Sequence, residues 1–312
     1  MNGPGTPTLD QLQVLLAVVE TGSFAAAARH LGRATSAISY AIDTLESQLD
    51  LVLFDRGTTR KPRLTPQGEA VLSEARLVTH GVDRLRARVR GLAEGLEAEI
   101  SLVVDVMFPT ARLVDALQAF QTAFPTVPLR LHVEALGAIT QLVLNGTASI
   151  GISGRFHLNG QGVEQIQIGG TRLIPVAAPF HPLACPQAQI PGAGRDHIQL
   201  VLTDRSPLTA GIDFGVIGVK TWRLADLGAK HALLLAGVGW GNMPETMIRE
   251  DLDAGRLVEL KLPDWGGGIY GMSIIRRTDS HPGPAGQWLI DRFVRQLDGL
   301  PDEEREPYVT EP

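Results

Sequence analysis

The sequence predicts an N-terminal helix-turn-helix with a small β wing, then a long linker helix, then an α/β domain of two lobes, in a chain of 312 residues. Three observations predict this order. Apolar residues recur at helical spacing between Leu9 and Leu49. Heptad spacing follows between Val71 and Leu92. After Glu99, apolar strands alternate with helical segments.

The first domain, expected over residues 1–65, begins with a loose tail and continues with three helices. The apolar face of the first helix is formed by Leu9, Leu12, Leu15, Leu16 and Val19. Gly22 ends that helix, Ser23 caps the second helix at 24–31, and Gly32 breaks the chain again. The third helix, 35–49, has a buried stripe of Ile38, Ile42, Leu45 and Leu49 and shows small polar groups in its first turns. This pair of helices around a short turn is the helix-turn-helix plan, and residues 51–64 predict a hairpin wing with its turn at Gly57 to Thr59.

A linker helix is expected over residues 66–96, with Thr65 as its N-cap and Pro66 as its first residue. Its apolar residues are spaced alternately by four and three: Val71, Ala75, Val78, Val82, Leu85, Val89 and Leu92. Such heptads favour a coiled-coil seam that pairs two chains. The alternative is a solvated helix that packs on its own domain.

Residues 97–300 predict an α/β domain with parallel strand pairs. The expected strands are 100–104, 127–133, 149–153, 172–178, 197–202, 219–224, 239–242, 256–260 and 269–275. The expected helices are 109–124, 138–144, 225–236, 244–254 and 285–300. Glycine runs at 169–170 and 266–268 predict paired crossovers between lobe I, about 97–169 with 269–300, and lobe II, about 170–268. The acidic tail, 301–312, is expected to be disordered.

Composition indicates an ordinary globular protein, with 44% hydrophobic and 20% charged residues. We find neither the ~18 uninterrupted apolar residues of a membrane span nor a signal peptide, so we expect a cytoplasmic protein without membrane contact. The one cysteine, Cys185, can form neither an internal disulfide nor a thiolate metal cage. The net charge of −6 is uneven: residues 1–96 carry 11 basic and 10 acidic side chains, and the remainder carries 17 and 24. A local basic patch, rather than a basic chain, is what phosphate contact requires.

The N-terminal 70 residues resemble the LysR-type transcriptional regulators. The resemblance is carried by Ala17 to Ala28 with Leu31, by Ser36 to Ser39 with Ile42, Leu45, Glu46 and Leu49, by Leu53 to Arg56, and by Leu64 to Gly68. Further along, His181 to Leu183, Ala236 to Gly239 and Met243-Pro244 resemble landmarks of that family's effector-binding domain.

This resemblance implies a winged helix-turn-helix, a dimerising linker and a two-lobed, periplasmic-binding-protein-like domain with a small-molecule effector in its cleft. It implies homodimers or homotetramers on double-stranded DNA, and contact with RNA polymerase if the protein activates. Because a dimer presents the third helix twice, the operator is expected to be an inverted repeat.

Nine residues are expected to meet DNA. Ser36, Ser39 and Tyr40 should reach base edges or phosphates, and Thr35 either joins them or serves as a helix cap. Phosphate contacts are expected from the wing residues Arg56, Arg60, Lys61 and Arg63, and from Arg33 in the turn. The family often has Gln-Pro and an arginine where this chain has Thr35, Ser36 and Tyr40, so its preferred bases should differ.

The effector is expected at the carboxyl ends of the strands. This rule selects Phe108, Pro109, Thr110, Leu136, Arg155, Thr203, Asp204, Trp222 and Asn242, and Trp240 lies next to them. Arg155 either pairs with a ligand carboxylate or is a surface charge, and Trp222 and Trp240 either line the pocket or fill the core.

No catalytic pattern accompanies these residues. The sequence has no phosphate loop, no His-Glu-x-x-His metal motif and no Gly-x-Ser-x-Gly elbow, so we expect no catalytic residue, no cofactor and no metal. Two alternatives to an effector-responsive regulator are an α/β enzyme with an accessory DNA-binding domain and a nucleoid protein that binds DNA without an effector. The full-size two-lobed domain argues against the nucleoid protein.

Overall fold

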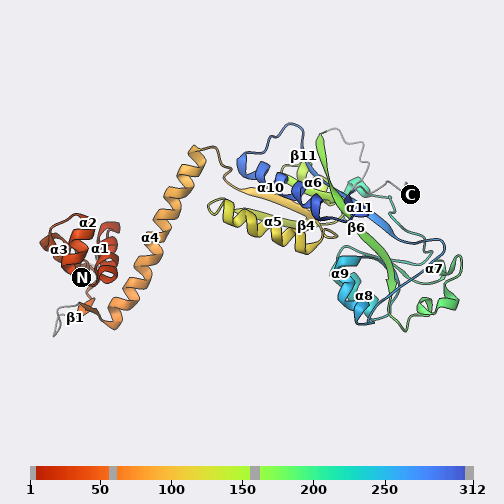
Figure 1. Ribbon diagram of the computed structural model, residues 1–312, viewed down its shortest axis with the longest axis horizontal. Coiled ribbons are helices and arrows are strands. Elements are labelled where there is room, and N and C mark those ends of the chain that lie inside the picture. Colours follow the sequence, from red (N-terminus) through yellow and green to blue (C-terminus); the bar gives the residue numbers. More distant parts are fainter. Residues whose placement is uncertain (1–4, 56–61, 155–161, 306–312) are drawn as a thin grey trace. The chain divides into compact units, whose positions relative to one another are not determined.

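A computed structural model describes residues 5–55, 62–154 and 162–305 of the chain, and they form two compact units, Met1–Ala93 and Glu94–Pro312 (Figure 1). Among the described residues, no single helix is long and apolar enough to cross a membrane. The bent pair formed by α1 (Leu9–Thr21) and α2 (Phe24–Leu31) meets that test together, with a bend of 118°, and its apolar side chains lie in the core of the first unit.

The first unit begins with three short helices, α1 (Leu9–Thr21), α2 (Phe24–Leu31) and α3 (Thr35–Leu49). Their ends are fixed as the sequence predicts: Gly22 and Gly32 adopt the left-handed conformation, with φ of 74° and 65°, and the Ser23 hydroxyl accepts a hydrogen bond from the N–H of Ala26. The alternative in which Thr35 caps the third helix is wrong. Thr35 is the first helical residue, and the N-cap is Ala34, which has no side chain to make the capping hydrogen bond.

The wing consists of β1 (Phe54–Asp55) and β2 (Arg63–Leu64), which pair antiparallel. The predicted hairpin turn, Gly57 to Thr59, lies outside the described residues.

The linker helix α4 (Pro66–Ala93) starts as predicted, because the Thr65 hydroxyl accepts a hydrogen bond from the N–H of Gly68 at 2.9 Å. Its first turns belong to the core of this unit: Leu72 and Ala75 are buried against α1 and the wing. Further along, the seam residues Val78, Leu85, Val89 and Leu92 are all exposed. The helix therefore covers its own domain at one end and leaves an apolar stripe uncovered at the other.

The second unit is a curved α/β structure. Its first lobe holds the parallel strands β3 (Ile100–Asp105), β4 (Leu129–Glu134) and β5 (Ile150–Gly154), with helices α5 (Thr110–Ala123), α6 (Gly137–Leu144) and α10 (Pro284–Arg295). Its second lobe holds β7 (Gln199–Leu202), β8 (Thr221–Leu224), β9 (Gly241–Pro244), β10 (Val258–Glu259), α7 (Ala193–Asp196), α8 (Leu227–Leu235) and α9 (Glu245–Asp253). The remaining short helices are Pro182–Ala184, Pro186–Ala188, Pro207–Thr209, Gln296–Gly299 and α11 (Asp302–Arg305).

Two long strands join the lobes, β6 (Val163–Ala177) and β11 (Gly268–Arg277), and they pair antiparallel along their length (Figure 1). In the described residues the main sheet runs β10-β6-β11-β5-β3-β4, with β9 on the second half of β6. A register shift between Gly271 and Ser273 lies opposite Gly169, whose φ is 87°. Gly169 and Gly170 therefore lie at a bulge in β6, and the glycine run 266–268 leads into the start of β11.

Two expectations differ from this fold. The sequence predicts a strand that begins only at residue 172, whereas β6 begins at Val163. The first half of β6 was not predicted because it is mostly exposed, mixes polar and apolar residues, and ends at two glycines. The tail is also expected to be disordered from residue 301, whereas residues 302–305 form α11, which lies against β6 and β11, and residues 306–312 lie outside the described residues.

Candidate DNA-binding face and interlobe pocket

The first turns of α3 present a polar face. Thr35, Ser36 and Tyr40 are exposed, Tyr40 by 73%, and Ser39 is half-buried. The helix is held in place from its other side by Ile38 and Ile42, which are both fully buried. Because α3 has no side-chain cap, the N–H groups of Thr35 and Ser36 remain available to an anion such as a phosphate, whereas the N–H of Ala37 donates to the carbonyl of Ala34 at 3.0 Å. This combination can read base edges with hydroxyl groups while a phosphate occupies the helix end.

Arg33 lies in the turn before α3 and is already paired. Its guanidinium donates two hydrogen bonds to the Asp10 carboxylate, at 2.9 and 2.6 Å. The hydrogen bonds from Arg33 lower the pKa of the Asp10 carboxyl. Both side chains are about half exposed. The pair links the turn to the start of α1. It also neutralises the positive charge of Arg33, which the sequence predicts to contact a DNA phosphate.

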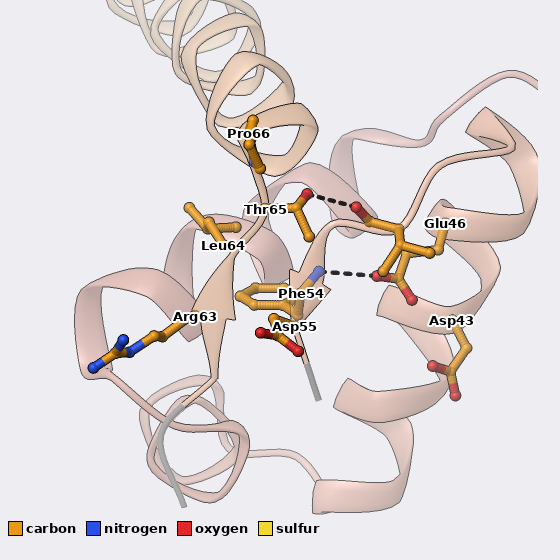
Figure 2. Close-up of a pocket in the computed structure, with 9 residues that line it drawn as sticks. Asp43, Glu46, Phe54, Asp55, Arg63, Leu64, Thr65 and Pro66 are labelled. Atoms are coloured by element: carbon orange, nitrogen blue, oxygen red, sulfur yellow. Dashed lines mark hydrogen bonds between the residues drawn. The ribbon is translucent and has the colours of Figure 1, made fainter. Parts of the chain in front are cut away.

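The wing is attached to α3 by Glu46. Its Oε1 accepts hydrogen bonds from the backbone N–H groups of Leu53, at 2.6 Å, and Phe54, at 3.1 Å. Figure 2 shows Glu46 pointing at the wing backbone across a surface notch, with the exposed Arg63 directed away from it. The other predicted wing contacts, Arg56, Arg60 and Lys61, lie outside the described residues. The Glu46 hydrogen bonds therefore fix the position of the wing relative to α3.

A cavity of about 200 Å³ lies between the lobes of the second unit. Leu136 contributes from lobe I and Asn242 from lobe II, as the strand-end rule predicts. Its walls are largely apolar and aromatic: Met107, Leu136, Leu173, Leu200, Val201, Leu202, Phe214, Trp265, Ile269 and Tyr270. Its described polar lining side chains are Gln199, Lys230, Asn242 and the hydroxyl end of Tyr270. Such a concave, mostly apolar space with a few polar groups is typical of a small-molecule site.

Leu136 has a strained backbone, with φ of 52° and ψ of −129°. This region disfavours any residue with a Cβ, and such strain is concentrated at ligand sites and switch regions. The residue immediately precedes α6 and is 6% exposed. The surrounding fold therefore holds Leu136, one of the residues that line the pocket from lobe I, in an unfavourable backbone conformation.

Other predicted cleft residues lie elsewhere. Phe108 packs edge-to-face on Phe293 in the lobe I core, at 5.8 Å between ring centroids, and Pro109 and Thr110 form the start of α5. Trp240 is fully buried in a lobe II core cluster and donates its indole N–H to the carbonyl of Gly194, so the core alternative applies to it. Trp222 is 48% exposed on β8, outside the pocket lining. Thr203 follows β7 and is half-buried, and Arg155 lies outside the described residues.

Asp204 bridges the lobes. Its carboxylate accepts hydrogen bonds from the Ala138 N–H at 2.8 Å and from the Thr209 hydroxyl at 2.5 Å. The contact places an acid of lobe II at the N-terminus of α6 in lobe I.

Sequence reasoning missed two buried groups at this site. Lys230, on α8, is 3% exposed and donates from Nζ to the carbonyl of Asn242 at 2.7 Å, and burial lowers its pKa to about 8. Asp105, at the end of β3, accepts a hydrogen bond from the Tyr270 hydroxyl at 2.8 Å, and burial raises its pKa to about 6. The prediction passed over Lys230 because it lies in the middle of an apolar helix, and it passed over Asp105, directly after the expected strand 100–104, in favour of Phe108 to Thr110.

Comparison with known proteins identifies both units. Residues 9–69 match the bacterial regulatory helix-turn-helix proteins of the lysR family, and residues 93–298 match the LysR substrate binding domain. The chain is similar to the probable transcriptional regulator YhaJ of Escherichia coli K12, at 30% identity over 80% of this chain and 84% of that protein. It is also similar to the transcriptional regulator AceR of Acinetobacter baumannii, at 27% identity over 92% and 96%.

Solved structures share the fold. A cysteine mutant of Corynebacterium glutamicum OxyR aligns over 94% of this chain and 92% of that one, with a TM-score of 0.51 and 20% identity. A point mutant of full-length BenM aligns over 94% and 96%, with a TM-score of 0.51 and 22% identity. These relatives and domains are those of regulators and not of enzymes. The chain therefore belongs to the LysR family of DNA-binding transcription regulators, with a helix-turn-helix domain and an effector-binding domain.

Proposed function

We propose that this regulator works in the cytoplasm as a homodimer, able to assemble into tetramers, that binds an inverted-repeat operator through α3 and is controlled by a small molecule in the interlobe pocket. The observation that carries the DNA-binding part is the exposed polar face of α3, with Tyr40 73% exposed beside Ser36 and Ser39 over a buried apolar stripe. A tyrosine at this place offers one hydrogen bond or a stacking surface, and not the bidentate bonding by which arginine selects guanine.

The exposed stripe on α4 supports the dimer. Val78, Leu85, Val89 and Leu92 are between 45% and 60% exposed, and the spacing of three and four places them on one side of the helix. A row of apolar side chains left in water costs free energy that a second copy of the helix would recover. Two copies of α3 then read two half-sites.

Control by a ligand requires that the ligand bind two states of the regulator unequally. The interlobe pocket suits this requirement, because its walls come from both lobes and its volume depends on how closely they approach. A change in that approach, transmitted through the dimer, would alter the spacing or bend of the bound DNA. If the protein activates, the same change would alter its contact with RNA polymerase.

A footprint on the DNA upstream of the protein's own gene tests the DNA-binding part. We expect a protected inverted repeat with the wild type, and loss of the specific protection with Ser39→Ala combined with Tyr40→Ala. Ser47→Ala is the matched control, since Ser47 is an exposed serine in the last turn of the same helix. Unchanged protection by the double variant would remove Ser39 and Tyr40 from the interface, and absence of any specific protection would overturn the proposed operator.

A further inference from the structure

The pocket between the lobes holds a buried lysine with which no acid among the described residues forms an ion pair. Lys230 is 3% exposed, and its Nζ donates to the neutral carbonyl of Asn242. Within the parts of the chain that the structure describes, no carboxylate forms an ion pair with Lys230. A buried charge is unfavourable unless it is paired and hydrogen-bonded, so the fold retains a cation here at a cost in stability.

The acceptors around Lys230 are already engaged. The side-chain oxygen of Asn242 accepts from the indole N–H of Trp265 at 2.9 Å. The side-chain oxygen of Gln199 accepts from the N–H groups of Ile217 and Gly218, and its amide donates to the carbonyl of Gly215. The pocket therefore offers hydrogen-bond donors, from the ammonium of Lys230 and the amide of Asn242, to whatever enters.

We propose that the interlobe pocket binds a small molecule with a single carboxylate, which pairs with Lys230 while its flat apolar body lies between the aromatic and aliphatic walls. This inference rests on the proposed function, in which this pocket is the effector site, and it names the chemical class of the effector. A carboxylate supplies both the missing negative charge and acceptor oxygens for the available donors.

The charge and size of the pocket narrow the class further. Lys230 is the one basic residue among the described lining residues, which favours a monoanion over a phosphate, since a second negative charge would be buried without a partner. The volume of about 200 Å³ lies below the ~300 Å³ at which pockets for drug-sized ligands begin. Phe214, Trp265 and Tyr270 offer ring faces to a planar body.

The test is isothermal titration calorimetry on the full chain with two aromatic carboxylates and their neutral amides: benzoate with benzamide, and phenylacetate with phenylacetamide. We expect at least one carboxylate to bind ten-fold or more tightly than its amide. Lys230→Met should abolish that preference, and Lys220→Met, an exposed lysine of the same lobe, should keep it. Equal binding of acid and amide, binding of neither carboxylate, or a preference that survives in Lys230→Met would each overturn the inference.

A second measurement needs no variant. Because burial lowers the pKa of Lys230 to about 8, the Lys230 side chain is neutral in part of the protein molecules at pH 8. A bound carboxylate favours the charged ammonium, so binding should be accompanied by uptake of a proton onto Nζ. Titrations at pH 8 in two buffers of different ionisation enthalpy should therefore show proton uptake, and its absence would overturn the pairing with Lys230. A footprint run in parallel separates the two proposals: protection that persists while the carboxylates fail rejects only the ligand class, whereas loss of protection rejects the DNA-binding function itself.

Discussion

The carboxylate of Asp204 accepts a hydrogen bond from the backbone N–H of Ala138, 2.8 Å away in the opposite lobe. Ala138 lies in the first turn of α6, where the N–H groups have no partner within the helix and the helix dipole is positive. Asp204 is itself held by the hydroxyl of Thr209. The two lobes are therefore joined beside the pocket by a charged helix cap that one lobe supplies to the other.

Removing this cap should loosen the approach of the lobes. We expect Asp204→Ala to lower the free energy of unfolding of the second unit by about 1–2 kcal/mol, the usual effect of losing an N-cap acid. It should also speed hydrogen exchange at the amides of Ala138 and Ile139. Asp226→Ala is the control, because Asp226 caps α8 through the N–H of Ala229 within a single lobe. Equal exchange at α6 in both variants would contradict the bridging role.

The pairing of Arg33 with Asp10 predicts a gain in DNA affinity when the acid is removed. Asp10→Ala leaves the guanidinium unpaired in the turn before α3, so it can neutralise one phosphate. We expect a steeper salt dependence of operator binding, by about one unit of slope in log K against log salt. The measurement is fluorescence anisotropy on an operator fragment at several salt concentrations.

Two further variants control the Asp10 experiment. Glu20→Ala removes one exposed acid from the other end of α1 and should leave the slope unchanged. Asp10→Ala combined with Arg33→Ala should return the slope to that of the wild type. If Asp10→Ala alone leaves the slope unchanged, Arg33 does not face DNA and serves only to hold the turn to α1.

Local sequence patterns predicted the first unit closely, and tertiary packing limited the prediction of the second. Helical spacing, Gly22, Ser23, Gly32 and Thr65 act within a few residues of themselves, so α1 to α4 follow from the sequence. The first half of β6 has little apolar character of its own and is specified by pairing with β11, which is more than a hundred residues away.

The same limit applies to the pocket. The strand-end rule found Leu136 and Asn242, because both follow or form strands whose ends meet between the lobes. It also selected Asp204, whose partner proved to be a helix end in the other lobe. Lys230 was missed, since a lysine in the middle of a helix reads as a solvated charge until the fold buries it.

The exposed stripe of α4 predicts that dimerisation depends on a few side chains. Leu85→Glu combined with Val89→Glu places two charges in the seam, and we expect sedimentation equilibrium to show at least a ten-fold weaker dimer. His80→Glu adds an acid to an exposed position of the same helix away from the seam and should leave the dimer intact. A dimer unaffected by the seam variant would mean that other surfaces hold the two copies together.

Asp105 predicts a dependence of stability on pH. Burial raises the pKa of this carboxyl to about 6 in the folded chain, above the ~3.9 of an unfolded aspartate. The folded state therefore holds the proton more tightly, so the stabilisation is fullest below pH 4 and is lost as the pH rises through 6. For this group alone, the free energy of unfolding should fall by about 2 kcal/mol between pH 4.5 and pH 7.5.

Asp105→Asn removes the titration and isolates that effect. Urea unfolding followed by tryptophan fluorescence reports on the second unit, because all four tryptophans lie in it. We expect the stability of the wild type relative to Asp105→Asn to decrease by about 2 kcal/mol from pH 4.5 to pH 7.5. Asp253→Asn, at an exposed position of α9, supplies the baseline for losing an aspartate. A stability difference that does not change with pH would show that Asp105 is ionised throughout and that its hydrogen bonds outweigh its burial.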